Sequence, residues 1–223
     1  MKRALTGLIA AGIVAFAAIP AQAAAVVVAK YNMNEPPGAT TMVDSSSYGN
    51  DGTLHNVQTG VPGWRGTAYQ FGNNNPSYVV VPDDPSLDPG NDGWSITARV
   101  SFPSYPDSTF DLVRKGLSTT AGGDYKLEIM RSGKSRCLFR GSTGQAVVIS
   151  DTSLSPDDWH TLRCVKTSNA VKLVVDGHKT FADLGAVGSI SNDASLLFGI
   201  KMEEGGDDYL GKMDQVVIKR LVP

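Results

Sequence analysis

Acidic and amide side chains gather near the start of the chain in a pattern that could hold a hard cation. The segment 44–52 reads Asp-Ser-Ser-Ser-Tyr-Gly-Asn-Asp-Gly, so it offers carboxylate, amide, hydroxyl and main-chain oxygens close together. Calcium takes six to eight such oxygen ligands, although this spacing is not that of an EF-hand loop. We predict a calcium site with Asp44 and Asn50 as ligands. The alternative is that both side chains only hydrogen-bond loop amides, as Asx-turn residues do.

Four basic side chains are predicted to share the outer face of a sheet: Lys126, Arg136, Arg140 and Arg163. Alternate side chains of a strand point to opposite faces. All four occupy positions opposite to apolar neighbours such as Leu127, Phe139 and Leu162. Guanidinium groups bind carboxylates and sulfates through two parallel hydrogen bonds. This predicts contact with an anionic polysaccharide, and the alternative is ordinary solvated charges paired with Glu128.

A tryptophan in a Gly/Pro-rich loop is a second kind of candidate. Trp64 lies in the segment Val-Pro-Gly-Trp-Arg-Gly at 61–66. An indole ring there offers an apolar face and a polar edge for stacking against a ligand. The alternative is that Trp64 caps one end of the fold.

Familiar catalytic motifs are missing from the sequence. It contains no Gly-x-Ser-x-Gly, no His-Glu-x-x-His and no Glu-x-Asp-x-x-Glu. Among the three histidines, His160 is expected to be partly buried and satisfied, and His178 to be solvated. A lyase needs a base, an acid and a group that neutralises a carboxylate. Tyr125, a histidine and Arg136 or Arg140 could supply them, so a polysaccharide lyase or glycoside hydrolase remains the alternative to a binding protein.

The first 23 residues have the pattern of a secretory signal. Lys2 and Arg3 precede an apolar stretch that is too short to span a bilayer comfortably, and an Ala-Gln-Ala cleavage signal ends at Ala23. We therefore expect a secreted domain over residues 24–223, with no membrane insertion. Removing Lys2 and Arg3 from the 20 basic residues leaves 18 against 22 acidic residues, a formal net charge of −4. Such a charge argues against a nucleic-acid partner.

Two cysteines remain in the exported chain, Cys137 and Cys164. Strand parity places each on the same face as an apolar neighbour, so both thiols should point inward. In an oxidising compartment we predict a disulfide between them. Two free buried thiols and a metal site are the alternatives.

Short β-rich runs must position these residues. Gly, Pro, Asn and Asp clusters separate the runs, and no segment shows sustained helical periodicity, which predicts a single all-β domain built as an antiparallel β-sandwich or jelly roll. The predicted strands are 25–31, 68–71, 78–81, 94–102, 111–114, 125–131, 136–140, 146–150, 159–166, 170–175, 195–200 and 212–220. Asp176-Gly177 predicts a β-hairpin that returns the chain through residues 178–181.

The order of several short motifs resembles the laminin-G-like, concanavalin A-like jelly rolls of bacterial secreted proteins. The motifs are the segments 31–35, 44–54, 66–71, 78–82, 94–98, 158–162, 173–177 and 209–218. The resemblance implies that the two ends of the chain pair, which would bring Glu35 and Asp214 near Asp44 as further calcium ligands. It also implies that Trp94 and Trp159 belong to the core.

The sequence therefore favours a secreted, non-catalytic carbohydrate-binding module, supported by calcium, whose partner is a polysaccharide or a glycosylated surface. The enzyme on the same fold is the first alternative, and a protein–protein adhesion module is the second. Fold cannot choose among them, because function depends on the site.

Overall fold

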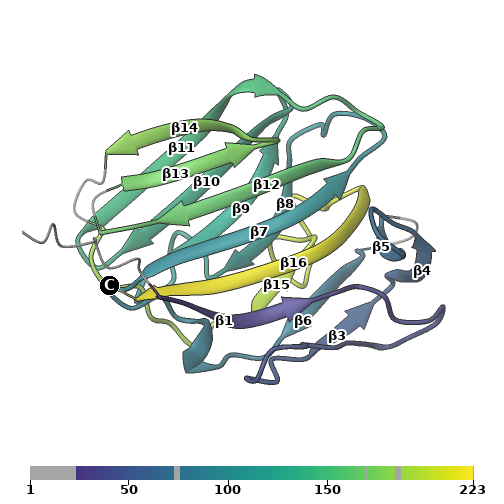
Figure 1. Ribbon diagram of the computed structural model, residues 1–223, viewed down its shortest axis with the longest axis horizontal. Coiled ribbons are helices and arrows are strands. Elements are labelled where there is room, and N and C mark those ends of the chain that lie inside the picture. Colours follow the sequence, from purple (N-terminus) through teal and green to yellow (C-terminus); the bar gives the residue numbers. More distant parts are fainter. Residues whose placement is uncertain (1–23, 73–75, 169, 184–186, 223) are drawn as a thin grey trace, which may run out of the picture.

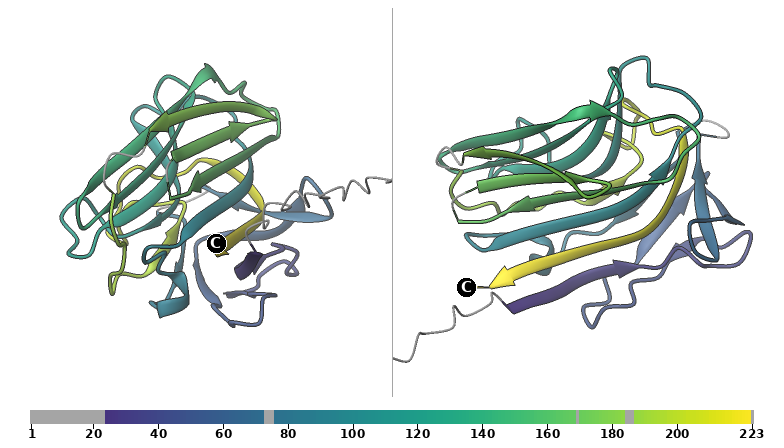
Figure 2. Two further views of the ribbon diagram at one scale, coloured as in Figure 1. Left: turned by 60° about the vertical axis from the view of Figure 1, so that its left-hand side comes forward. Right: turned by 45° about the horizontal axis from the view of Figure 1, so that its top comes forward.

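The computed structural model describes residues 24–72, 76–168, 170–183 and 187–222. The predicted signal segment, residues 1–23, lies outside the described residues. Within them, two antiparallel sheets pack face to face as a β-sandwich, as predicted (Figures 1 and 2). The only helical element in this part of the chain is the 3₁₀ turn η1 (Pro85–Leu87). No helix among the described residues is long and apolar enough to cross a membrane.

Sheet A contains eight strands within the described ranges, and both ends of the domain lie in it. Its order is β14 (His178–Asp183), β13 (Ala170–Val175), β12 (His160–Lys166), β7 (Gly93–Ser101), β16 (Gly211–Val222), β5 (Thr67–Phe71) and β4 (Gln58–Pro62), and β1 (Ala24–Tyr31) pairs with β16. The β1–β16 ladder runs antiparallel from Ala24 opposite Val222 to Tyr31 opposite Val216. The expectation that the two ends pair is therefore confirmed.

Sheet B also has eight strands in the described part of the chain. Its order is β11 (Gly144–Ser153), β10 (Lys134–Gly141), β9 (Asp124–Met130), β8 (Thr109–Lys115), β15 (Leu196–Phe198), β6 (Tyr78–Val81), β3 (Gly52–His55) and β2 (Thr41–Met42). Each run predicted from the sequence corresponds to a strand. The short strands β2, β3 and β4 were not predicted, because few alternating apolar residues mark them.

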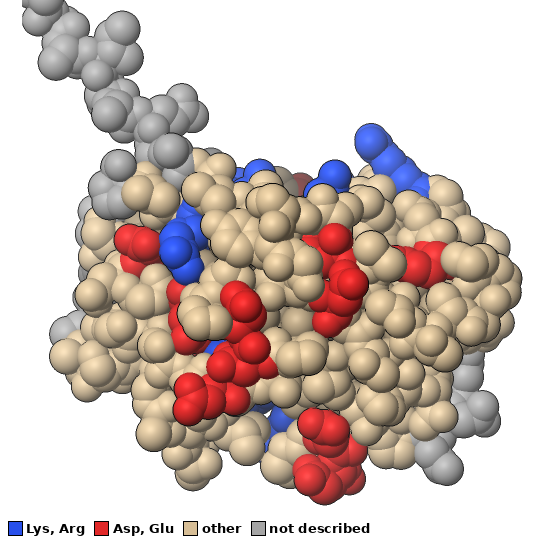
Figure 3. Space-filling view, turned by 90° about the horizontal axis from the view of Figure 1, so that it is seen from below, with Lys and Arg blue, Asp and Glu red and all other residues tan. Residues whose placement is uncertain are grey.

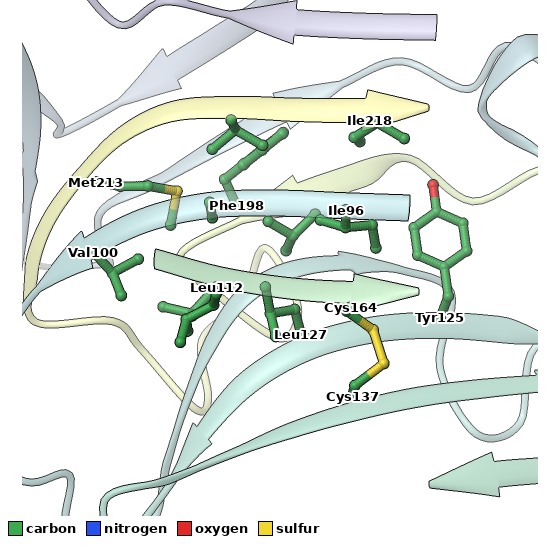
Figure 4. Close-up of a cluster of buried hydrophobic side chains, with 14 of the residues drawn as sticks. Ile96, Val100, Leu112, Tyr125, Leu127, Cys137, Cys164, Phe198, Met213 and Ile218 are labelled. Carbon is green, nitrogen blue, oxygen red and sulfur yellow. A yellow bond between two sulfur atoms is a disulfide. The ribbon is translucent and has the colours of Figure 1, made fainter. Parts of the chain in front are cut away.

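The core lies between the sheets and follows the period-two pattern of the strands. Ile96 and Val100 of β7 meet Leu127 of β9 and Phe198 of β15, and all four are fully buried (Figure 4). The β13–β14 hairpin turns at Asp176 and Gly177, with φ angles of 47° and 90°. Positive φ at both central positions is what a two-residue hairpin turn requires, so this prediction is confirmed.

The predicted disulfide is present and joins the two sheets. Cys137 on β10 and Cys164 on β12 are both fully buried, with their Cα atoms 5.4 Å apart. The alternatives of free thiols and a cysteine metal site are thereby excluded for this pair. The two core tryptophans behave differently: Trp94 is fully buried, but Trp159 is only partly buried at the edge of β12. The expectation that Trp159 belongs to the core is therefore wrong.

Candidate functional site

Three of the four predicted basic residues share the outer face of sheet B. Lys126 on β9 and Arg136 and Arg140 on β10 alternate with side chains that are buried in the core. Arg163 does not join them. It lies on β12 of sheet A, where its Nε donates a hydrogen bond to Ser95 Oγ at 3.1 Å. The prediction of one face with four cations is wrong for Arg163, because β12 pairs with β7 and β13 rather than with β9 or β10.

Each of these three cations contacts a carboxylate on the same face. Glu128, which is fully buried, pairs with both Lys126 (Nζ to Oε2, 2.5 Å) and Arg136. Arg140 Nε lies 2.5 Å from Asp124 Oδ1. Burial alone would raise the pKa of Glu128, but hydrogen bonds and charge from Lys126, and then from Arg136, hold the pKa below its usual value. The alternative of paired charges is thus observed, with two cations sharing Glu128.

A second buried ion pair extends the charged face onto β8. Arg114 Nε lies 2.8 Å from Asp111 Oδ2, and Asp111 stands directly opposite Glu128 in the β8–β9 ladder. Burial raises the pKa of Asp111 to about 7, and the like charge of Glu128 adds to this effect, whereas Arg114 opposes it. Two neighbouring carboxylates therefore have their pKa values moved in opposite directions, as occurs at functional sites and in structural ion-pair networks alike.

The outer face of sheet B is hollowed where these strands end. Two adjoining cavities of about 210 Å³ and 170 Å³ share Arg114, Leu117 and Lys201 in their linings. We call this hollow the groove, and define it by Arg114, Leu117, Lys126, Leu138, Arg140 and Lys201. It combines four basic groups and two aliphatic side chains with the carboxylates of Asp124, Glu203 and Glu204, and serine and threonine hydroxyls of the loop 117–120 complete its wall. Lys201 Nζ also lies 3.7 Å from Asp207 Oδ2.

The loops beside the groove are held by backbone contacts. In the loop 116–123, Gly122 has a φ of 82°, and a Cβ there would come 1.7 Å from Ser191 O. Only glycine fits this close approach. Arg140 Nη2 donates to Leu117 O at 2.5 Å, which ties the floor to this loop. On the other side, Asp111 N donates to Asp207 O at 2.8 Å and fixes the loop 201–208.

Another side of the molecule is acidic. Figure 3 views the side that lies at the bottom of Figure 1, near β1, β3 and β6, where Asp and Glu side chains gather in several clusters and few Lys or Arg side chains are visible. Like charges repel an anionic ligand there.

The Asp44 loop uses its polar side chains for internal hydrogen bonds. Asp44 Oδ1 accepts from Lys30 N and Ser46 N, both at 2.8 Å, while Oδ2 accepts from Asn50 N at 2.9 Å and from Ser46 Oγ at 2.7 Å. Asn50 Nδ2 donates to Val28 O and Ser86 Oγ. These bonds match the Asx-turn alternative, and they join the loop to β1 and η1.

The other two predicted calcium ligands have partners of their own. Glu35 accepts from Val43 N at 3.0 Å and from the Tyr69 hydroxyl at 2.5 Å. Asp214, fully buried on β16, accepts from Arg65 N at 3.0 Å. Among the described residues, no three or more His, Cys, Asp or Glu side chains are grouped so that they could hold a metal ion. Calcium stays a prediction that rests on the oxygen-rich loop.

Trp64 is exposed on the outer side of sheet A. Its ring centroid lies 6.4 Å from that of Trp159, and the Arg99 guanidinium lies 5.7 Å from the Trp64 ring centroid. The fraction of its surface that is exposed is 46%. Trp64 therefore does not line the groove, and the structure separates it from Lys126, Arg136 and Arg140.

Ser155, His160 and Asp176 have the residue types of a catalytic triad. His160 Nδ1 lies 2.6 Å from Asp176 Oδ2, and Nε2 lies 3.5 Å from Ser155 Oγ. However, Nε2 also lies 2.9 Å from the carbonyl oxygen of Ser155, and the Ser155 hydroxyl donates to Asp158 at 2.6 Å. A base must accept the hydroxyl proton, whereas here Nε2 faces a main-chain acceptor. The hydrogen bonds of these three residues therefore join the loop before β12 to the β13–β14 turn, and His160 is buried with hydrogen-bond partners, as predicted.

Sequence reasoning missed Asp111, Arg114 and Lys201. Simple alternation places Asp111 and Arg114 on opposite faces of β8, but a β-bulge between Asp111 and Val113 puts both on the outer face. A bulge adds one unpaired residue and shifts the phase of a strand. The one available signal was a charged residue at each end of the apolar pair Leu112-Val113.

Comparison with known proteins identifies a family. A family model described as "Concanavalin A-like lectin/glucanases superfamily" matches residues 72–221. No curated protein sequence matches the chain.

Several solved structures share the fold at low sequence identity. The binding domain of Paraclostridial mosquitocidal protein 1 aligns with a TM-score of 0.71 and 16% identity, over 89% of this chain and 49% of that one. A structure of botulinum neurotoxin type C, whose cell entry depends on interaction with two ganglioside molecules, gives a TM-score of 0.66 and 12% identity, over 86% of this chain and 47% of that one. The chain thus spans about half the length of these toxin chains.

A third structure matches over nearly its full length. Domain 4 of AbnA, an extracellular arabinanase of Geobacillus stearothermophilus solved in complex with arabinotriose, aligns with a TM-score of 0.64 and 17% identity, over 89% of this chain and 95% of that domain. At such identities the likeness establishes the fold alone.

Proposed function

Because the chain belongs to the concanavalin A-like lectin/glucanases superfamily, we propose that it is a non-catalytic carbohydrate-binding module whose groove takes an anionic polysaccharide. One observation carries this proposal: the groove is lined by four basic side chains, those of Arg114, Lys126, Arg140 and Lys201. Arabinotriose and gangliosides, the carbohydrates described for two similar structures, support a glycan as the class of ligand.

The charge of the groove floor favours an anion despite the ion pairs. Glu128 neutralises only one of the two cations that contact it, which are Lys126 and Arg136. Asp111, with a pKa of about 7, carries a partial charge near neutrality and leaves Arg114 incompletely neutralised. The Lys126–Arg136–Glu128 cluster therefore carries one more positive than negative charge, whereas Arg140 is paired with Asp124 and Lys201 with Asp207. Basic groups fixed by buried partners are already oriented for a carboxylate or sulfate.

Export and calcium belong to the same proposal. The segment 1–23 has the pattern of a secretory signal, and the Cys137–Cys164 disulfide suits an oxidising compartment. Calcium would support the fold at the Asp44 loop, where carboxylate, amide and main-chain oxygens crowd together. A polysaccharide or glycosylated surface outside the cell is the partner that this combination implies.

One observation favours an enzyme as the second candidate. Asp111 and Glu128 face each other across two strands with pKa values moved in opposite directions, as in acid–base pairs of glycosidases. Both side chains are fully buried, however. A substrate oxygen can reach neither buried carboxylate in this arrangement, so binding is better supported than hydrolysis.

Retention on polysaccharides tests the proposal. We expect the protein to be retarded in gels containing polygalacturonate or alginate but not dextran, and the retardation to weaken as salt rises. A Lys126→Gln, Lys201→Gln variant should lose roughly fivefold to thirtyfold in affinity, since a charge contact at a protein surface contributes up to about 1 kcal/mol.

Arg163→Gln is the matched control, because it removes an exposed cation from the opposite sheet. It should bind like the unchanged protein. Equal losses in both variants, or no retardation by either acidic polymer, would contradict the proposal. New reducing ends or unsaturated ends in the same incubations would instead support the enzyme.

A further inference from the structure

The outer face of sheet A carries a pair of tryptophans, Trp64 exposed and Trp159 partly buried, on the side of the sandwich opposite to the groove. Trp64 comes from the loop between β4 and β5, and Trp159 immediately precedes β12. Their rings meet edge to face at an interplanar angle of 66°. The third tryptophan, Trp94, is fully buried. Two of the three indoles are therefore placed together at the surface.

A buried carboxylate fixes the loop that carries Trp64. Asp214 Oδ2 accepts from Arg65 N at 3.0 Å, and Asp214 itself is fully buried. Burial raises the pKa of Asp214, and hydrogen bonds from the backbone N–H groups of Arg65, Gln215 and Trp64 offset part of that rise. The loop is also closed by a Gly63 N to Gly66 O hydrogen bond at 3.1 Å. The fold thus uses a buried charge to hold an exposed indole in one position.

Arg99 supports the indole from the sheet. Its guanidinium lies over the Trp64 ring, 5.7 Å from the centroid, and its Nη1 donates to Gln215 Oε1 at 2.6 Å. Arg99 stands on the outer face of β7, because its neighbours Ala98 and Val100 are buried in the core. One face of the indole is therefore braced, and the exposed part of the ring remains available for a ligand.

A rigid exposed indole is the kind of group on which ligands stack at low entropic cost. An indole face is apolar, while its N–H and nearby polar groups can pair with hydroxyls. A sugar ring has the matching chemistry, with C–H groups on one face and hydroxyls around the edge. Arg99 and Gln215 supply polar partners beside the ring.

We infer that Trp64, Trp159 and Arg99 form a second carbohydrate contact, which stacks a sugar ring of a polysaccharide and needs no charge on that sugar. We call these three residues the tryptophan platform. The inference rests on the proposed function only in that both surfaces take a polysaccharide. Two contacts on opposite faces make the module bivalent, so that it can join two polysaccharide chains.

Tryptophan fluorescence tests the platform directly, with arabinotriose, cellohexaose and xylohexaose as neutral probes. Because Trp94 is fully buried, a saturable change in emission reports on Trp64 and Trp159. We expect at least one probe to produce it. Trp64→Ala should lower the affinity for that probe at least about tenfold. Trp64→Phe should retain most of the affinity, since a phenyl ring still stacks.

Three further variants separate the platform from general effects. Tyr48→Ala removes an exposed aromatic elsewhere and should leave the probe's affinity unchanged. The Lys126→Gln, Lys201→Gln variant should also keep it. Asp214→Asn should weaken binding without removing an aromatic ring, because it loosens the Trp64 loop. Protein already bound to polygalacturonate should still respond to the probe.

The outcomes distinguish the two proposals. If none of the three probes changes the emission, or if Trp64→Ala binds as the unchanged protein does, the platform is wrong while the groove stands. If a probe binds at Trp64 but no acidic polysaccharide retards the protein, the proposal for the groove is wrong and the proposal for the platform stands.

Discussion

The buried pair of Asp111 and Glu128 makes stability depend on pH in a defined direction. The pKa of Asp111 rises from 3.8 to about 7 on folding, chiefly through burial. The native state therefore holds a proton that the unfolded chain has already released between these two pH values. Stability from this group is fully present below the unfolded pKa and is lost as pH rises through the folded pKa.

The size of the effect follows from the two pKa values. For 3.8 and about 7, Asp111 contributes roughly 2.5 kcal/mol at about pH 5 and almost nothing at about pH 8. Asp111→Asn keeps the shape and the hydrogen-bonding oxygen but does not titrate. The free energy of unfolding of the variant, taken relative to that of the unchanged protein, should rise by roughly 2.5 kcal/mol over the same pH range.

Urea unfolding at several pH values and constant ionic strength measures this difference. Asp107→Asn, which alters an exposed carboxylate, is the matched control and should track the unchanged protein at every pH. Parallel stability curves for Asp111→Asn and the unchanged protein would refute the reasoning, because they would mean that Asp111 is ionised throughout. If Asp111→Asn does not fold, carboxyl NMR titration of the unchanged protein gives the same pKa.

Three other changes have expected outcomes. Replacing Cys137 and Cys164 by serine removes the disulfide, which joins positions 27 residues apart. Calorimetry should show the free energy of unfolding lowered by about 3.5 kcal/mol and the Tm by roughly 10 °C; a shift in Tm below about 2 °C would contradict this. Removing calcium with EDTA should lower the Tm, and Asp44→Ala should abolish that response; no change with EDTA would leave the loop's hydrogen bonds as the sole role of Asp44. Gly122→Ala should cost roughly 1–3 kcal/mol and weaken polygalacturonate binding, because its Cβ meets Ser191 O; an unchanged urea midpoint would disprove this.

The sequence was sufficient where one local pattern decided the outcome. Alternation fixed which face of β9 and β10 is buried, so Tyr125, Leu127 and Phe139 were assigned to the core and Lys126, Arg136 and Arg140 to the surface. The same alternation pointed Cys137 and Cys164 inward, and two inward thiols on facing sheets can meet. The Asp176-Gly177 pair specified its hairpin, because few residues tolerate positive φ at both positions.

Strand neighbours were beyond the reach of local patterns. Arg163 has the same parity as Arg136, yet it ends up on the other sheet, because pairing of β12 with β7 depends on contacts across the whole chain. The bulge in β8 is a similar case. It shifts Arg114 onto the same face as Asp111 and so completes the groove, although the sequence reads as plain alternation.

For the candidate site residues, too, some properties followed from the sequence and others only from the tertiary structure. The sequence alone determined that the segment 44–52 is an oxygen-rich turn and that the chain forms a β-sandwich, whereas the pairing of its ends was implied by the family resemblance and is a matter of strand order. Tertiary structure decided that Asp214 holds the Trp64 loop and that two unpredicted residues, Arg114 and Lys201, line the groove. The reason is physical: side-chain direction follows from neighbours along the chain, whereas a site is made by residues brought together through strand order, and strand order is set by the packing of the whole core.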